Sequence, residues 1–272
     1  MSGGRMSGGR MSGGRMSGGR MSGGGMTGGS MSGGGMSGPT GRLAVVTGGT
    51  SGIGLAIARR LVSDGFGVIA AARNAVDDLP WGITHAALDV TDRGGVDALF
   101  AGLPRLDLLV NNAGLAGSQR DDPDDVLWHA ILATNLTGAW FCSRAALSRL
   151  PDRTGRIVNI ASVLGLRGVA DQPAYVAAKH GLVGLTRAMA MQAAPRGITV
   201  NAICPGWVDT AMAAQRYAEI GITAEQAAAG VPTGRIATPW EVADAVAFLA
   251  RAGAGSITGQ AIVIDGGSSA HA

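Results

Sequence analysis

Short apolar runs alternate with longer segments of helical period from Arg42 onward, and this alternation limits the possible folds more than any other feature. The runs predict strands at 43–47, 67–72, 84–88, 106–110, 156–161, 198–204 and 261–264. The intervening segments predict helices at 53–64, 93–101, 124–150 and 173–193, with further helical pieces between 211 and 251. Short apolar strands separated by helices indicate a parallel sheet covered on both faces. The sequence therefore predicts an α/β fold, a single doubly wound domain of about seven strands in residues 41–272.

Residues 1–40 have a different character, because Met recurs every five residues and is followed mostly by Ser-Gly-Gly. Such a segment cannot bury enough apolar surface to offset its chain entropy, so it is predicted to be a disordered tail. It contains four arginines and no acidic residue, which leaves 18 basic and 19 acidic residues in the remainder. The sequence pI of about 9.4 therefore comes from the tail. An RNA-binding tail is the alternative, but the tail has no aromatic residue to stack on bases.

The charge, the apolar runs and the cysteines of the residues after the tail exclude several classes of protein. The near-neutral body indicates no nucleic-acid partner, and no apolar run is long enough to cross a membrane. The two cysteines, Cys142 and Cys204, have neither ligand-like spacing nor a secretory segment ahead of them. We therefore expect no disulfide framework and no metal site, and a reducing, cytoplasmic location.

A glycine-rich turn follows the first predicted strand and opens the first predicted helix. Gly48, Gly52 and Gly54 lie where the backbone could approach a phosphate and offer its N–H groups. An ordinary βα turn would contain similar residues, but this turn follows the first strand of a doubly wound sheet. Its position favours dinucleotide binding in a Rossmann fold.

A tyrosine and a lysine stand out because the chain hardly uses either residue. Lys179 is the single lysine among 22 basic residues, and Tyr175 is one of two tyrosines. Side chains four residues apart share a helix face, and a nearby ammonium lowers the pKa of a phenol. Such a tyrosine can act as a general acid or base, although an isolated Tyr–Lys pair is more often a surface feature. Ser162 follows a predicted strand, where its hydroxyl could cap a helix or donate to a substrate carbonyl.

The spacing G-x-x-x-G-x-G, the sequence Asn111-Asn-Ala-Gly114, Ser162 and the Tyr175/Lys179 pair occur in the order found in the short-chain dehydrogenase/reductase family. The chain resembles this family over nearly all of residues 42–267, and especially its 3-oxoacyl-thioester reductases and secondary-metabolism ketoreductases. The resemblance implies that Tyr175 transfers the proton, Lys179 lowers its pKa and binds the nicotinamide ribose, and Ser162 orients the carbonyl. It also implies that Asn135 holds a water molecule in the proton relay.

The resemblance further implies a set of cofactor contacts. Besides Tyr175 and Lys179, these are Gly48, Thr50, Ser51, Gly52, Ile53, Gly54, Arg73, Asp89, Val90, Asn111, Ala113, Gly114, Pro205, Gly206, Val208 and Thr210. Arg73 ends the second predicted strand, with no acidic residue before Asp77. An arginine at this position can bind a ribose 2′-phosphate, whereas an acidic residue would bind the 2′-hydroxyl. The sequence therefore favours NADPH over NADH, with a solvated arginine as the alternative.

The resemblance therefore implies an NADPH-dependent carbonyl reductase acting on a small ketone or an acyl-thioester ketone. An NAD-dependent alcohol or hydroxysteroid dehydrogenase and a non-catalytic nucleotide-binding regulatory protein are the alternatives. The alanine-rich segment 211–235 resembles the variable substrate lid of the family. The family also implies a homotetramer or homodimer that packs through segments 124–150 and 173–193.

Overall fold

The computed structural model describes residues 1, 38, 40–74, 76, 78–119 and 125–270. The predicted tail of residues 1–40, apart from residues 1, 38 and 40, lies outside the described residues, and so does Asp77.

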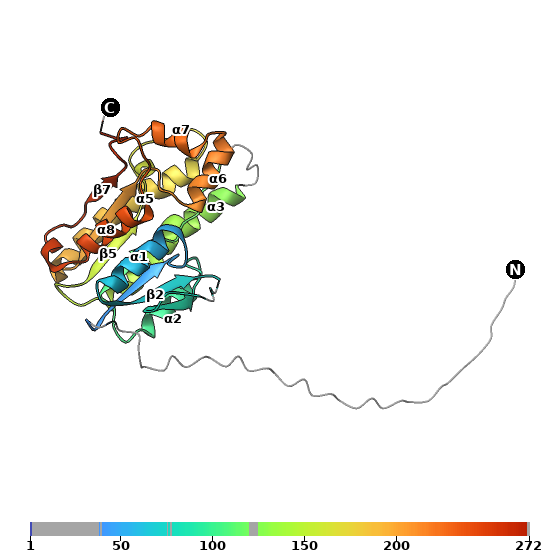
Figure 1. The fold of residues 1–272 in the computed structure, drawn as a ribbon. Coiled ribbons are helices and arrows are strands. Elements are labelled where there is room, and N and C mark those ends of the chain that lie inside the picture. Colours follow the sequence, from blue (N-terminus) through green and yellow to red (C-terminus); the bar gives the residue numbers. More distant parts are fainter. Residues whose placement is uncertain (2–37, 39, 75, 77, 120–124, 271–272) are drawn as a thin grey trace. The chain divides into compact units, whose positions relative to one another are not determined.

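Seven parallel strands form one sheet in the order β3-β2-β1-β4-β5-β6-β7 (Figure 1). The strands are β1 (Arg42–Thr47), β2 (Phe66–Ala72), β3 (Ile83–Ala87), β4 (Leu108–Asn111), β5 (Arg156–Ile160), β6 (Thr199–Pro205) and β7 (Ala261–Ile264). All seven predicted strands are confirmed close to their predicted limits. The chain runs from β1 outward to β3 and then returns to β4 on the other side of β1. This reversal opens a crevice beyond the carboxyl ends of β1 and β4, where doubly wound folds bind ligands.

Eight α-helices lie in the described part of the chain. They are α1 (Gly52–Ser63), α2 (Arg93–Ala101), α3 (Val126–Leu132), α4 (Ala139–Leu147), α5 (Pro173–Ala193), α6 (Ala211–Ile220), α7 (Ala224–Ala229) and α8 (Pro239–Leu249). Shorter turns are the π turn η1 (Ala133–Gly138) and the 3-10 turns η2 (Val163–Gly165), η3 (Ala194–Arg196) and η4 (Ala252–Ala254). Helix α5 has its predicted limits, whereas the predicted helix 124–150 is divided by η1 into α3 and α4.

The π turn η1 lies against the loop that follows β3. A Cβ atom at Gly138 would stand 2.7 Å from Cγ2 of Val90, so a side chain at this position would push the helix away from that loop. A π turn changes the direction of the side chains after it relative to a continuous α-helix. The apolar period in the sequence contains no signal for this change.

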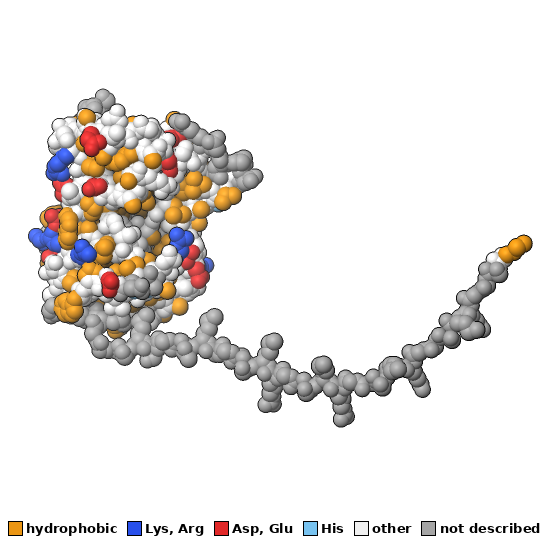
Figure 2. Space-filling model, turned by 45° about the vertical axis from the view of Figure 1, so that its right-hand side comes forward, with side chains coloured by type: hydrophobic (Ala, Val, Ile, Leu, Met, Phe, Trp, Pro, Cys, Tyr) orange, Lys and Arg blue, Asp and Glu red, His pale blue; other side chains and the backbone are white. Residues whose placement is uncertain are grey.

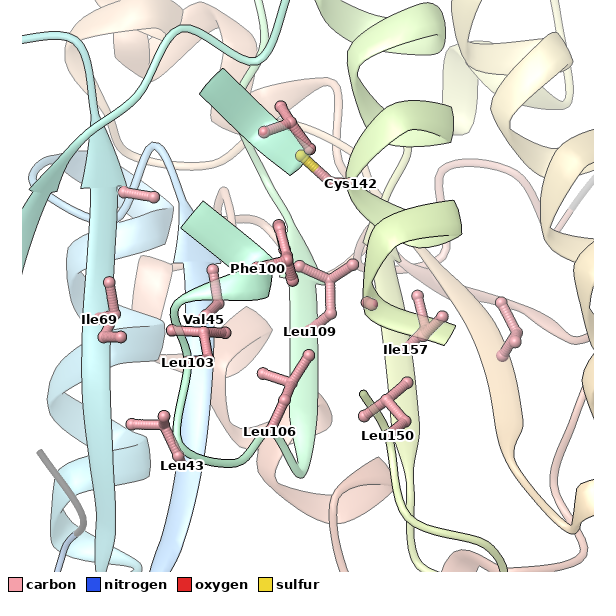
Figure 3. Packing of buried hydrophobic residues seen from close by; sticks show 14 of the residues in the cluster. Leu43, Val45, Ile69, Phe100, Leu103, Leu106, Leu109, Cys142, Leu150 and Ile157 are labelled. Atoms are coloured by element: carbon pink, nitrogen blue, oxygen red, sulfur yellow. The ribbon is translucent and has the colours of Figure 1, made fainter. Parts of the chain in front are cut away.

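Helices cover both faces of the sheet, as the uniformly apolar strands predict. Helices α1 and α8 pack on one face, while α2, α4 and α5 pack on the other. Figure 3 shows the core of the second face, where Val45, Ile69 and Leu109 of the sheet belong to one buried cluster with Phe100 of α2 and Cys142 of α4. Each fully buried Leu, Ile or Phe contributes roughly 1.5–3 kcal/mol relative to an exposed position. The two cores hold the strand ends, and hence the loops beyond them, in a fixed arrangement.

The surface carries few charged side chains, in keeping with a charged content of 15%. Figure 2 shows charged side chains scattered among hydrophobic ones on the face it presents. Within the described ranges, none of the helices combines the length and apolar character needed to cross a membrane.

Candidate active site

A cavity of about 490 Å³ lies beyond the carboxyl ends of β1, β4, β5 and β6. Residues from all four connecting loops and from helices α5 and α6 line it. Thirteen residues predicted to form the site line this cavity together: Gly48, Ser51, Gly52, Ile53, Ala113, Gly114, Ser162, Tyr175, Lys179, Pro205, Gly206, Val208 and Thr210. The structure therefore gathers into one cavity residues that are far apart in the sequence.

The β1–α1 turn presents backbone rather than side chains to the cavity. Gly48 and Gly52 have φ angles of +63° and +50°, which L residues with side chains rarely adopt. A Cβ atom at Gly54 would overlap the carbonyl oxygen of Gly48, so α1 can approach the turn this closely only with glycine there. The turn is thus a glycine cradle built by close backbone packing.

Helix α1 directs an uncapped N-terminus at the cavity. Its N-cap residue, Ser51, makes no side-chain hydrogen bond to the helix, and no acidic residue lies in the first turn. The first N–H groups of a helix lack intrahelical partners, and the helix dipole favours an anion beside them. The cradle and this helix end therefore fit the pyrophosphate of a dinucleotide.

Thr47 and Asn112 join the glycine turn to the loop after β4, and sequence reasoning missed this role. The Thr47 hydroxyl accepts hydrogen bonds from the backbone N–H groups of Asn112 and Ala113, both at 3.0 Å. The Asn112 amide donates to the carbonyl oxygens of Thr47 and Gly48 at 3.0 and 3.2 Å. The positions of Thr47 before the glycine run and Asn112 within Asn-Asn-Ala-Gly were the available sequence signals. These bonds hold two walls of the cavity at a fixed separation.

Ser162, Tyr175 and Lys179 meet on the same side of the cavity. Ser162 follows β5 and caps η2, because its hydroxyl accepts a hydrogen bond of 3.1 Å from the Leu164 N–H. The Ser162 hydroxyl is close enough to Tyr175 to lower the pKa of its phenol. Lys179 is 5% exposed; its Nζ donates to the Ile160 carbonyl oxygen at 2.8 Å and lies 5.5 Å from the Tyr175 ring centroid. The predicted group of hydroxyl, phenol and ammonium is therefore assembled in one place.

The predicted lowering of the Tyr175 pKa is not found. Burial raises the pKa of Tyr175, and the nearby Ser162 hydroxyl only partly opposes this rise. Burial also lowers the pKa of Lys179 to about 8. The reason is that desolvation disfavours both charged forms, and the Lys179 ammonium is bonded to the Ile160 carbonyl rather than to the phenol.

Asn135 lies in the π turn and is 1% exposed. Its amide donates to the Leu115 carbonyl oxygen at 2.8 Å and accepts from the Leu115 N–H at 2.7 Å. The side chain thus binds both backbone groups of one residue in the loop after β4. This pairing fixes that loop against the π turn.

Six residues predicted to contact the cofactor do not line the cavity: Thr50, Gly54, Arg73, Asp89, Val90 and Asn111. The Asn111 amide instead donates inside the core to Ser143 and Asn159, both at 2.8 Å. The Asp89 carboxylate accepts from the backbone N–H and hydroxyl of Thr91, and these bonds lower the pKa of Asp89. Side chains alternate along an extended strand, so adjacent residues of one motif can point to opposite sides.

Arg73 directly follows β2, and its exposed side chain is accessible to a ligand from solvent. The described part of the chain offers its guanidinium no ion pair, although its charge contributes to the low pKa of Asp89. An unpaired guanidinium remains available to an anion.

The sequence indicated segment 211–235 as a substrate lid, but it singled out none of the following residues on the substrate side of the cavity. Apolar side chains from the loops and from α6 line it: Val163, Leu164, Val169, Trp207, Met212 and Ile220. Arg216 of α6 also lines this region and pairs with Asp171, just before α5. No sequence signal links these two residues, because the pair depends on how α6 folds back. In the described ranges, no group of three or more His, Cys, Asp or Glu side chains could hold a metal ion.

Comparison with known proteins agrees with this geometry. The family model described as enoyl-(acyl carrier protein) reductase matches residues 48–269. A putative ketoacyl reductase of the monensin polyketide synthase from Streptomyces virginiae is 42% identical over 84% of this chain and 97% of its own length. The 3-oxoacyl-(acyl-carrier-protein) reductase FabG of Vibrio harveyi is 38% identical over 84% of this chain and 97% of its own length.

A solved structure gives the same result. A variant of the actinorhodin polyketide ketoreductase, crystallised with NADPH, has a TM-score of 0.78 and 39% identity. The match covers 85% of this chain and 98% of the ketoreductase. With its glycine cradle, its assembled serine, tyrosine and lysine, and relatives matched along almost their whole length, this chain belongs to the short-chain dehydrogenase/reductase family of NAD(P)-dependent oxidoreductases.

Proposed function

We propose that this protein is an NADPH-dependent keto reductase that acts on a ketone or a 3-oxoacyl thioester. The observation that carries the proposal is that Ser162 and Tyr175 line the same cavity as the glycine cradle. A carbonyl group held by their hydroxyls would lie in the same cavity as a nucleotide bound at the cradle. The ketoacyl reductases among the relatives support this choice of substrate.

The residues that would hold the cofactor follow from the cavity. The glycine cradle and the N-terminus of α1 would bind the pyrophosphate, and Arg73 would bind a ribose 2′-phosphate. Lys179 would bind the nicotinamide ribose, while the Val208 backbone and the Thr210 hydroxyl would hold the carboxamide. When bound, NADPH supplies the hydride that the carbonyl carbon accepts. The NADPH in the related polyketide ketoreductase supports this cofactor.

Tyr175 would donate the proton that the carbonyl oxygen takes up. Ser162 would donate a hydrogen bond to that oxygen and thereby stabilise the charge that develops on it. Its raised pKa leaves Tyr175 protonated at neutral pH, which is the form that a proton donor requires, although it also makes the phenol a weaker acid. Asn135 would hold a water molecule of the proton relay by a group other than its side-chain amide, which is bonded to Leu115. The ketoacyl reductases and the NADPH-bound ketoreductase among the similar proteins favour keto reduction over the alternative of an NAD-dependent dehydrogenase.

The proposal includes assembly into a homodimer or homotetramer through α4 and α5. Trp140 of α4 is 38% exposed, a large apolar side chain of the kind that interfaces cover. Sedimentation analysis would give the number of subunits.

The test begins with binding and then measures turnover. Purified protein is titrated with NADPH and NADH by nucleotide fluorescence, and NADPH oxidation is then followed with a 3-oxoacyl thioester. Tyr175→Phe should lower kcat by roughly 10²–10⁴-fold, the contribution of a general acid, and leave NADPH affinity within about twofold.

Tyr217→Phe is the matched control. The Tyr217 hydroxyl has no hydrogen-bond partner in the described structure. Its ring packs beside the Trp207 ring, and Tyr217 does not line the cavity. This variant should retain the wild-type rate. A Tyr175→Phe variant that turns over as fast as the wild type would remove Tyr175 from the mechanism.

A further inference from the structure

Helix α6 forms one wall of the substrate side of the cavity, and none of its residues is in the two clusters that pack against the sheet. Met212, Ala213, Arg216 and Ile220 line the cavity from this helix. Apolar contacts support its other side, where Ala213 and Tyr217 pack with Ala227 and Trp207. Among the described residues, this apolar cluster joins α6 to its own neighbours in the chain, α7 and the loop after β6, and it contains no residue of the loop that carries Ser162 and leads to Tyr175.

The link from α6 to that loop is an ion pair. Nη2 of Arg216 donates to both carboxylate oxygens of Asp171 at 2.8 and 2.7 Å. The side chains are 13% and 8% exposed, and no other ion pair among the described residues buries both partners this far. Nη1 of Arg216 also contacts Glu219 at 3.1 Å within α6. The guanidinium is therefore neutralised although it lines the cavity.

Asp171 lies four residues before Tyr175, and a second long-range contact holds the segment between them. The Gln119 side-chain oxygen accepts a hydrogen bond of 2.7 Å from the Ala174 N–H in the first turn of α5. The Gln119 N–H in turn donates to the Asp171 carbonyl oxygen at 2.9 Å. Residues 171–174 are thus held from one side by Gln119 and from the other by Arg216. Because Tyr175 follows directly, any shift of Asp171 acts on the start of the helix that carries it.

We propose that Asp171 and Arg216 are positioning residues for keto reduction, which strap α6 across the substrate side of the cavity and fix that wall relative to Tyr175. This inference rests on the proposed function. The strap forms the apolar wall before substrate arrives, so the substrate does not have to order α6 on binding. Because Asp171 neutralises Arg216, the strapped wall suits an uncharged ketone or acyl chain rather than an anionic one.

The geometry of the strap specifies the variants that test it. Arg216→Met removes the charge and keeps an unbranched side chain, leaving Asp171 without this partner. Arg216→Lys is the rescue variant, since one nitrogen makes both contacts with Asp171 and an ammonium can do the same. Arg144→Met is the matched control: Nη2 of Arg144 on α4 donates to both oxygens of Asp97 on α2, at 2.8 and 3.1 Å, away from the cavity.

Steady-state kinetics with a 3-oxoacyl thioester should separate positioning from general stability. In Arg216→Met, KM should rise about tenfold or more, kcat should fall less than this, and the Kd for NADPH should stay within about twofold. Arg216→Lys should recover most of the loss, and Arg144→Met should keep the wild-type KM. Asp171→Asn should raise KM in the same sense, and the double variant Asp171→Asn/Arg216→Met should be no worse than Arg216→Met. The proposal would be overturned if Arg216→Met had the wild-type KM, or if KM rose equally in Arg144→Met.

Hydrogen exchange gives a readout that does not depend on activity. Backbone amides of α6 should exchange faster in Arg216→Met than in the wild type and should be unchanged in Arg144→Met. If the wild type reduces no keto substrate, the proposed function fails, while the exchange of α6 still decides whether the strap exists. If Arg216→Met does not fold, Asp171→Asn decides by the same exchange measurement, and unchanged exchange in that variant overturns the strap.

Discussion

At the scale of single residues, the chain distinguishes two kinds of cation. Arginine supplies almost every positive charge, and the single lysine lies buried between the Ile160 carbonyl and the Tyr175 ring. Arginine stays protonated at any physiological pH, whereas a buried lysine has a pKa that its surroundings can shift. Lys179 is such a residue, because burial lowers its pKa to about 8.

Replacement of Lys179 should change how stability depends on pH. The unfolded lysine titrates near 10.5 and the folded one near 8, so between these values the unfolded chain binds the proton that the folded protein has released. The free energy of unfolding of the wild type should therefore rise between about pH 8 and 10 relative to Lys179→Met, by up to about 3 kcal/mol. Urea denaturation of both proteins at pH 7.5, 8.5 and 9.5 measures the difference, and parallel pH dependences would contradict a lowered Lys179 pKa.

Arg73→Asp should reverse the nucleotide preference. The substitution removes a donor to the 2′-phosphate and places a carboxylate where it could accept from the 2′-hydroxyl. Because charge-assisted hydrogen bonds are lost and like charges are introduced, NADPH affinity should fall roughly tenfold or more relative to NADH. Fluorescence titration with both nucleotides measures the ratio. Arg93→Asp, which changes an exposed arginine of α2, is a control for charge alone, and an unchanged ratio in Arg73→Asp would exclude a role for Arg73.

At the scale of elements, the important feature is how closely the β1–α1 turn packs against the loop after β4. Gly54, Thr47 and Asn112 together set the separation of these two loops, through one missing side chain and four hydrogen bonds. The π turn acts in the same way, because it carries Asn135 to the Leu115 backbone. Both devices use backbone geometry to hold the cavity walls.

Gly54→Ala should abolish tight nucleotide binding. The new Cβ would overlap the Gly48 carbonyl oxygen and lie 2.5 Å from Nδ2 of Asn112, so α1 must move away from the cradle. We expect NADPH affinity to fall at least about tenfold, with a loss of stability of roughly 1–3 kcal/mol from overpacking. Gly184→Ala is the control, because a Cβ atom at that exposed position of α5 meets nothing within 4 Å. Equal NADPH affinities in the two variants would show that the packing of Gly54 is unimportant.

At the scale of the whole molecule, the sequence divides into a glycine-rich repeat and a domain that contains all the predicted site residues. Deletion of residues 1–35 should leave kcat, KM and the thermal midpoint unchanged, because a segment this rich in glycine cannot bury enough apolar surface to offset its chain entropy. Differential scanning calorimetry and steady-state assays of the truncated and full-length chains provide the measurement. A large loss of rate would show that the repeat is part of the active assembly.

Most of the fold was predictable from the sequence, because a parallel sheet covered on both faces requires apolar strands whatever the details of packing. The strand limits and α5 follow from this pattern. The division of the helix after β4 did not follow, since the π turn retains an apolar face and depends on contacts with Val90 and Leu115. The predicted site residues that line the cavity lie in the loops after the strands or on the helices that follow them, whereas Asn111, at the last position of β4, turns to the core.

The sequence by itself determined the order of strands and helices, the glycine turn, and the rare lysine one helical turn after a tyrosine. These are local properties, set by the period of burial and by the conformational freedom of single residues. Only the tertiary structure decided the direction of the Tyr175 and Lys179 pKa shifts and the pairing of Asp171 with Arg216. Desolvation and ion pairing depend on which distant segments surround a group, and that is established only when the chain has folded.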